Sequence, residues 1–340
     1  MIHSFLPRSV FLCCLMVVCI ADVSAKTDSL ISDFRKADSI AALYPRHSLR
    51  DMKSLAEKLT MPLHTEEEKF RVIYKWVCNN IDNDYALNQQ NQLKREKIKD
   101  PQELKDWNTK IGWKVIRNLV DKQQTVCTGY AYLLRELSMD AGLSCIIIDG
   151  YGRTVQSNVR GEGRVNHSWN AIRLRNQWYL CDATWSAGAY DMQLHEYVKN
   201  YNNDYFLAEP VLFIRNHYPL DSAWMLLKDK PTLSEFLSRP LIYPGFYHYQ
   251  VTKLLPETFN AKAVKGKMFS FQLEAKDTIK VNKVELIIKS SNAVKSFYPP
   301  LTKTSNDLYT IDHVFTQKGT HIVHVRFDDN YVCTYTVNVK

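Results

Sequence analysis

The chain has 340 residues, 45% of them hydrophobic, and its 44 basic and 36 acidic residues give a net charge of +8. This length and composition suit one sizeable buried core and a second smaller one, and they exclude a disordered chain and a bundle of membrane-spanning helices. The densest basic run, residues 94–99, is interrupted by Glu96 as in an ordinary solvated surface, so we expect no nucleic-acid partner.

Residues 1–25 have the features of a secretory signal peptide. Arg8 supplies a positive charge, residues 9–20 form an apolar run, and small residues lead up to Ala25. The apolar run is shorter than the roughly 20 residues that a membrane-spanning helix needs. We therefore expect cleavage near Ala25 and a secreted or periplasmic, extracytoplasmic mature chain without a transmembrane segment.

The next segments differ in pattern. Residues 26–65 carry helical spacing of apolar residues, and we expect this N-terminal helical segment to pack on the core that follows. Residues 86–105 are polar and rich in Gln, Asn and Lys, which predicts a surface loop. Such a loop could border a cleft, although a plain connection is the simpler interpretation.

A cysteine stands where a helix is expected to begin. After Thr125 the sequence passes through a turn, and apolar residues then recur at helical spacing: Tyr130, Leu133, Leu134, Leu137 and Ala141. Cys127 thus lies at the first helical turn, where unpaired N–H groups and the helix dipole stabilise a thiolate. Alone, however, such a cysteine is more often a small buried apolar residue.

A histidine and an aspartate follow on a predicted hairpin. Residues 167–174 and 178–185 have the pattern of two strands joined by a short polar turn. A turn centred at Arg175 and Asn176 would place Asp182 opposite Trp169 and diagonal to His167 on the same face. Each residue alone has an ordinary structural explanation, but together with Cys127 they could form a thiol nucleophile, its base and an orienting carboxylate.

The pattern changes again toward the C-terminus. Residues 186–250 mix short helices with prolines and many aromatic residues, and we expect this segment to pack against one side of the hairpin. After Pro256, short alternating segments separated by turns predict an all-β sandwich of immunoglobulin-like type over residues 256–340.

The number and spacing of the cysteines indicate whether the chain has free thiols, disulfides or a metal site. Five cysteines follow the leader, and an odd number in an exported protein implies at least one free thiol, for which Cys127 is the natural candidate. The others could form two disulfides, but their apolar neighbours favour buried thiols: Cys78, Cys145, Cys181 and Cys333. The sequence has no CxxC pair, no HxxxH spacing and no DxDxDG calcium loop, so we expect no metal and no cofactor.

Three short motifs carry a resemblance to a known family: Val126-Cys127-x-Gly129-Tyr130-Ala131, His167-x-Trp169-Asn170 and Asp182-x-Thr184-Trp185. They resemble the transglutaminase-like superfamily with its papain-like Cys-His-Asp core, in particular the branch similar to kyphoscoliosis peptidase. Further matches extend the resemblance over residues 66–250. It implies an α+β catalytic core in which the helix bearing the cysteine packs on an antiparallel sheet bearing the histidine and the aspartate.

The resemblance also implies roles for the three residues. Cys127 would be the nucleophile, His167 the general base and then acid, and Asp182 the residue that orients the histidine. We expect a secreted thiol acyl-transfer enzyme that acts on peptide or carboxamide bonds through a thioester, most simply a cysteine peptidase or amidase. The alternatives are transglutaminase-type crosslinking or deamidation, and a non-catalytic secreted binding or adaptor protein. The partner would be a protein or peptide substrate, and this substrate could be associated with the cell surface or the cell wall.

The chain departs from the family pattern near the nucleophile. Thr125 stands where a glycine is common, and the family's Tyr-Asp pair appears as Asn83-Asp84 followed by Tyr85. The backbone N–H of Cys127 is the expected oxyanion donor. The additional candidates for oxyanion stabilisation or substrate positioning are Asn83, Tyr85, Trp169 and Trp185.

Overall fold

The computed structural model describes residues 33–154, 164–191, 196–276, 278–291, 293–304 and 307–340. The leader expected at residues 1–25 lies outside these described residues, as does the start of the segment expected at residues 26–65. Within the described ranges, no helix combines the length and the hydrophobicity needed to cross a membrane.

Three helices open the described chain: α1 (Arg35–Ala42), α2 (Met52–Thr60) and α3 (Glu66–Asn80). Thr65 and Glu68 form a capping box that satisfies the first N–H groups of α3. Helix α3 is buried along most of its length, with Phe70 and Trp76 in the main core. Helix α1 packs on α3, and α2 packs on both α3 and α6 (Cys127–Asp140).

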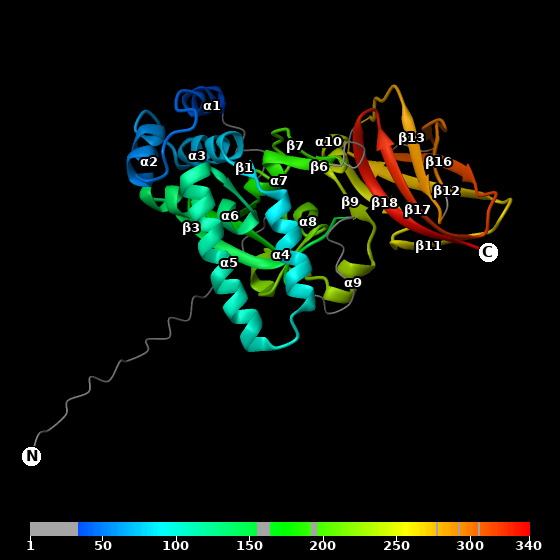
Figure 1. Cartoon of the computed structure of the whole chain (residues 1–340). Coiled ribbons are helices and arrows are strands. Elements are labelled where there is room, and N and C mark those ends of the chain that lie inside the picture. The colour runs from blue at the N-terminus through cyan, green and yellow to red at the C-terminus, as the bar shows by residue number, and fades with distance from the viewer. Residues whose placement is uncertain (1–32, 155–163, 192–195, 277, 292, 305–306) are drawn as a thin grey trace, which may run out of the picture. The chain divides into compact units, whose positions relative to one another are not determined.

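The centre of the fold is an antiparallel sheet with the order β5-β4-β3-β8. Helix α6 packs against strands β3 and β4 (Figure 1). The α+β class predicted from the sequence is therefore confirmed. The bounds of the four strands are β3 (Ser144–Gly152), β4 (His167–Leu174), β5 (Gln177–Cys181) and β8 (His217–Pro219).

The hairpin β4–β5 turns at Arg175 and Asn176, as predicted. Both residues have positive φ, 46° and 66°, which is the requirement of a two-residue hairpin turn that follows the twist of the strands. Strand β5 ends earlier than expected, because Asp182 caps the short helix α7 (Ala183–Ala187) by accepting the N–H groups of Thr184 and Trp185.

The prediction of a surface loop at residues 86–105 is wrong, because the segment forms α4 (Tyr85–Lys97) and the start of α5 (Pro101–Lys122). Asp84 and Asp100 cap these helices with their side chains. A small apolar cluster, Leu87, Val115 and Val126, joins the two helices to the residue before Cys127. Most other side chains of α4 face solvent, so its polar composition masked the helical pattern.

The chain then passes through short elements toward the C-terminal sheets. Strands β6 (Gly188–Asp191) and β7 (Glu196–Lys199) form an antiparallel pair. The following elements are α8 (Pro210–Phe213), η3 (Ser222–Met225), α9 (Leu233–Ser238), β9 (Leu241–Ile242) and α10 (Pro244–His248). Strand β9 pairs with β18 and helix α10 packs on β18, so this segment is attached to the C-terminal sheets.

Two sheets make up the C-terminal region (Figure 1). One has the order β10-β12-β16-β15, and the other has the order β11-β18-β17-β13-β14. Apolar residues of both sheets, among them Phe271 and Val323, share one buried cluster, so the sheets form a sandwich. The strands are β10 (Val251–Leu255), β11 (Asn260–Ala263), β12 (Met268–Ala275), β13 (Val284–Lys289), β14 (Val294–Phe297), β15 (Thr302–Lys303), β16 (Leu308–Val314), β17 (Gly319–Phe327) and β18 (Asn330–Val339). The immunoglobulin-like type of this sandwich stays a prediction.

Candidate active site

Cys127 is the first residue of α6, and its side chain is partly exposed. The capping residue Val126 has an extended backbone and offers no side-chain hydrogen bond to the helix start. The helix start therefore lacks a side-chain cap, and the positive end of the helix dipole favours a thiolate at this position. The four other described cysteines are buried free thiols, as their apolar neighbours predict.

Thr125 explains why residue 129 has no side chain. A Cβ atom at Gly129 would lie 1.8 Å from Oγ1 of Thr125, which is itself fully buried. Thr125 is fixed in turn by β2 (Gln124–Thr125), which pairs with β1 (Asp82–Asn83) and places Asn83 beside Thr125. Thr125 occupies the position two residues before the cysteine where the family commonly has a glycine. Its side chain fills the space that a side chain at residue 129 would need, so a glycine fits at 129.

His167 and Asp182 form a buried hydrogen-bonded pair. Nε2 of His167 lies 2.7 Å from Oδ2 of Asp182, and the two side chains are 7% and 1% exposed. The other oxygen, Oδ1, accepts the N–H groups of Thr184 and Trp185. Because Asp182 takes up Nε2, Nδ1 is the ring nitrogen left to interact with the Cys127 thiol, whose pKa the imidazole lowers.

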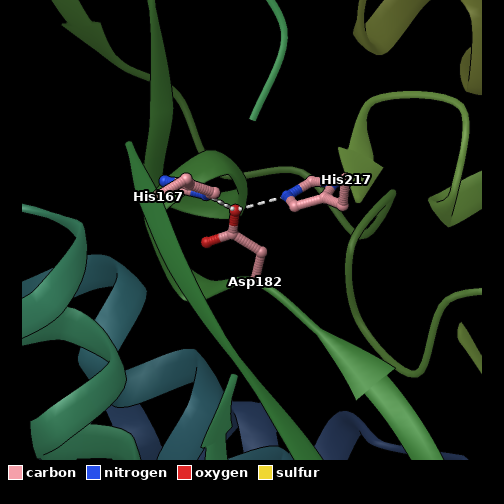
Figure 2. Close-up of side chains that lie close together, drawn as sticks. All are labelled: His167, Asp182 and His217. Carbon is pink, nitrogen blue, oxygen red and sulfur yellow. Dashed lines mark hydrogen bonds and ion pairs between the residues drawn. The ribbon is translucent and has the colours of Figure 1, made fainter. Parts of the chain in front are cut away.

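A second histidine contacts the same carboxylate oxygen. Nε2 of His217 lies 3.0 Å from Oδ2 of Asp182, and the two imidazoles approach this oxygen from opposite sides (Figure 2). No role for His217 follows from the sequence pattern. Its place depends on β8, which pairs with β3 so that His217 lies opposite Gly152. A three-residue strand with a distant partner leaves almost no local pattern from which this contact could be predicted.

Electrostatics favour an ion pair between the thiol and the imidazole. Burial raises the pKa of Cys127, but the hydrogen bond and charge of His167, with a backbone hydrogen bond from Ser168, outweigh it and lower the pKa. Burial lowers the pKa of His167, and the charge and hydrogen bond of Asp182 reverse this and raise it well above the usual value. Asp182 itself stays ionised, because its burial is outweighed by the two histidines, which depress its pKa.

The pKa of His217 shifts in the opposite direction to that of His167. Burial lowers its pKa to about 4, although Asp182 partly opposes that shift. The ring is therefore neutral near pH 7 and donates its single N–H from Nε2, since a carboxylate can only accept. Oδ1 of Asn216 lies 2.7 Å from Nδ1. Because a neutral ring that donates from Nε2 can only accept at Nδ1, the Asn216 amide must be turned over so that its NH2 group donates to this nitrogen.

The two tryptophans predicted as positioning residues lie in different places. Trp185 stacks on His167, with ring centroids 5.0 Å apart, and lines a cavity beside it. Trp169 is 1% exposed and packs behind the site against Phe213 and His217, so the structure places it outside the described lining of this cavity.

The cavity has a volume of about 660 Å³ and contains both Cys127 and His167 in its wall. Asn83 and Tyr85, predicted as positioning residues, also line it. Helix α4 also contributes the amide residues Asn88, Gln89 and Gln92 to the lining, so this segment borders the cleft. The wall continues onto residues attached to or within the C-terminal sheets: Tyr243, His248, Asn330 and Tyr331.

His167, Asp182 and His217 are also the one cluster in the described part of the chain with the donor set of a metal site. Their donor atoms all lie within 4.8 Å of one another, but the oxygen of Asp182 is already 2.7 Å and 3.0 Å from the two ring nitrogens. These distances are those of hydrogen bonds. A tetrahedral ion with bonds of about 2.0–2.2 Å would require these ligands to move apart.

Comparisons with known proteins agree with the resemblance described above. Residues 53–183, which contain the cysteine, histidine and aspartate, match the model of the transglutaminase-like superfamily. The chain is 29% identical over 322 residues to kyphoscoliosis peptidase of Homo sapiens, a match that covers 88% of this chain and 45% of the relative. These matches bear out the predicted resemblance to the superfamily over residues 53–183 and to the kyphoscoliosis-peptidase branch over most of the chain.

Two further relatives extend this comparison. Kyphoscoliosis peptidase of Mus musculus is 28% identical over 284 residues, covering 80% of this chain and 39% of the relative. Hillarin of Drosophila melanogaster is 27% identical over 234 residues, covering 64% of this chain and 26% of the relative. The chain spans less than half the length of these curated relatives.

Proposed function

From the transglutaminase-like core that the chain carries and its similarity to kyphoscoliosis peptidases, we propose that this protein is a thiol acyl-transfer enzyme that hydrolyses peptide or carboxamide bonds. Cys127 is the nucleophile, His167 the base and Asp182 the orienting carboxylate. The observation that carries the proposal is the 2.7 Å hydrogen bond from His167 to buried Asp182, which leaves Nδ1 of the ring for a thiol of lowered pKa.

In the first half of the reaction, the thiolate of Cys127 attacks the carbonyl carbon, and the carbonyl oxygen takes up the displaced electron pair. The backbone N–H of Cys127, at the positive end of α6, stabilises this oxyanion. When the tetrahedral intermediate collapses, the C–N bond breaks and His167 gives its proton to the leaving amine. The product is a thioester on Cys127.

In the second half, an acceptor attacks the thioester. His167 takes a proton from water as the new C–O bond forms, and the C–S bond breaks to release a carboxylic acid and the thiol. An amine in place of water would give transamidation by the same steps. The name of the kyphoscoliosis peptidases supports water as the acceptor.

The sequence of residues 1–25 supports a secreted or extracytoplasmic location, and the cavity supports a protein or peptide partner. An extracytoplasmic thiol enzyme would act on proteins at the cell surface or in the cell wall. The transglutaminase-like core and the ion-pair electrostatics favour an enzyme over a non-catalytic adaptor on the same scaffold.

The test is product analysis by mass spectrometry after incubation with a mixture of synthetic peptides and a primary amine. We expect new peptide termini with the wild-type protein and none with Cys127→Ala. Cys145→Ala, which alters a buried thiol away from the cavity, is the matched control and should still cleave. Cleavage that survives in Cys127→Ala would contradict the assignment, and products in which the added amine has replaced ammonia or the leaving peptide amine would identify transamidation.

A further inference from the structure

One carboxylate in the wall of the catalytic cavity has no partner among the residues that the structure describes. Asp204 lines the same cavity as Cys127 and His167. Its backbone N–H donates to the side chain of Asn202, but no residue in the described ranges donates a hydrogen bond or an ion pair to its carboxylate. Other charges of this wall are compensated, since Arg326 is paired with Glu285 at 3.3 Å and with Asp329 at 2.8 Å.

Hydrogen bonds connect the backbone around Asp204 with Asp182 and Trp185. The next residue, Tyr205, accepts the N–H of Asp182 through its carbonyl oxygen at 3.0 Å. The side chain of Asn202 accepts the N–H of Asp204 and donates to the carbonyl oxygen of Trp185, each at 3.1 Å. Asp204 is therefore tied through Asn202 to the tryptophan that stacks on His167.

The surroundings of this carboxylate suit a cation. Burial raises the pKa of Asp204 to about 6, and no neighbouring positive charge opposes the shift. A half-buried carboxylate without a counter-charge costs free energy that a bound cation would recover. Trp185 lines the same cavity, and an indole is the aromatic side chain that attracts ammonium and guanidinium groups most strongly.

We propose that Asp204 and Trp185 form a subsite that binds a positively charged group, an alkylammonium or a guanidinium, beside the thiol. The inference builds on the proposed function, because the cation must belong to a molecule that reacts at Cys127. Two sources share this chemistry: a basic side chain of a peptide substrate, and an amine that accepts the acyl group.

The first experiment compares alkyl methanethiosulfonates that carry a trimethylammonium group, no charge, or a sulfonate group. Each forms a mixed disulfide with Cys127 and releases methanesulfinate, so the reactive group is the same. We expect Asp204→Asn to lower the ratio of cationic to neutral rates about threefold or more, and to raise the anionic to neutral ratio. Asp204→Glu, which keeps the charge, should stay close to wild type.

Glu209→Gln is the matched control, because it removes the same charge five positions along the chain from an exposed residue. Its ratios should equal those of the wild type. If Asp204→Asn, with an unchanged melting temperature, leaves both ratios as they are in the wild type, the subsite is overturned.

The second experiment identifies the source of the cation with p-nitrophenyl esters as acyl donors, which acylate Cys127 and release p-nitrophenolate. Faster acylation by the Nα-acetyl-lysine ester than by the Nα-acetyl-norleucine ester, lost in Asp204→Asn, indicates a substrate side chain. Capture of the Nα-acetyl-norleucyl group by cadaverine, lost in Asp204→Asn, indicates an acceptor amine. Equal lysine and norleucine rates together with no amine capture would overturn the subsite. No acyl-enzyme from any ester would instead reject the proposed function.

Discussion

His217 donates a hydrogen bond to the same oxygen of Asp182 that His167 uses, and it does so from complete burial. With Thr184 and Trp185 bonded to Oδ1, both oxygens of Asp182 are held by two donors each. The carboxylate that orients the proposed base therefore cannot rotate without breaking contacts to two other elements. His217 acts on the site through Asp182, as a positioning residue.

Replacing His217 with leucine should weaken both the fold and the site. A hydrogen bond to a buried carboxylate contributes about 2 kcal/mol, so we expect a comparable loss in the free energy of unfolding measured with urea. Alkylation of Cys127 at pH 6.5 should also become slower. His217→Gln, whose amide can reach the position of Nε2, should recover most of the alkylation rate. Equal rates in wild type and His217→Leu would contradict the positioning role.

The same histidine should make stability depend on pH. The pKa of His217 falls from its ordinary value of 6.5 to about 4 in the folded protein, so protonation favours unfolding. Its contribution is complete above pH 6.5 and is lost as the pH falls toward 4. The free energy of unfolding should therefore decrease by up to about 3 kcal/mol over this window, and by clearly less in His217→Gln. The same decrease in both proteins would contradict the argument.

Gly152 should be intolerant of a side chain because His167 lies against it. A Cβ atom there would be 3.0 Å from Cβ and Cγ of His167, which requires the imidazole to move by a few tenths of an ångström. We expect Gly152→Ala to slow Cys127 alkylation near pH 6.5 about tenfold, because proton transfer depends on the position of the base. Gly112→Ala is the control, since the space around Gly112 is open, and it should leave the rate unchanged.

The contact between Thr125 and Gly129 should appear as coupling between two substitutions. Gly129→Ala places a methyl group 1.8 Å from Oγ1 of Thr125 and should destabilise the fold by about 2 kcal/mol. Adding Thr125→Gly removes the clashing side chain, so the double variant should lose less stability than the sum of the single variants. Chemical denaturation of all four proteins measures the coupling free energy. Simple additivity would mean that the two residues do not share this space.

Much of the fold can be predicted from local patterns. The apolar spacing after Cys127 predicts its helix, and the turn at Arg175 and Asn176 sets the strand register that brings Asp182 near His167. In contrast, α4 escapes prediction because only Leu87 of its residues is buried. His217 and Asp204 reach the site through long-range contacts of β8 and of Tyr205, and no local pattern encodes such contacts.

The most direct test of the proposed nucleophile and base is the pH dependence of Cys127 alkylation by iodoacetamide. Cys127→Ala, which should not be labelled, shows that the signal comes from this thiol. The lowered pKa of Cys127 predicts rapid labelling below pH 7 in the wild type, less in Asp182→Asn, and its collapse in His167→Ala. Slow labelling in the wild type that rises only above about pH 8.5, as for an ordinary thiol, would contradict the ion pair and with it the proposed enzyme.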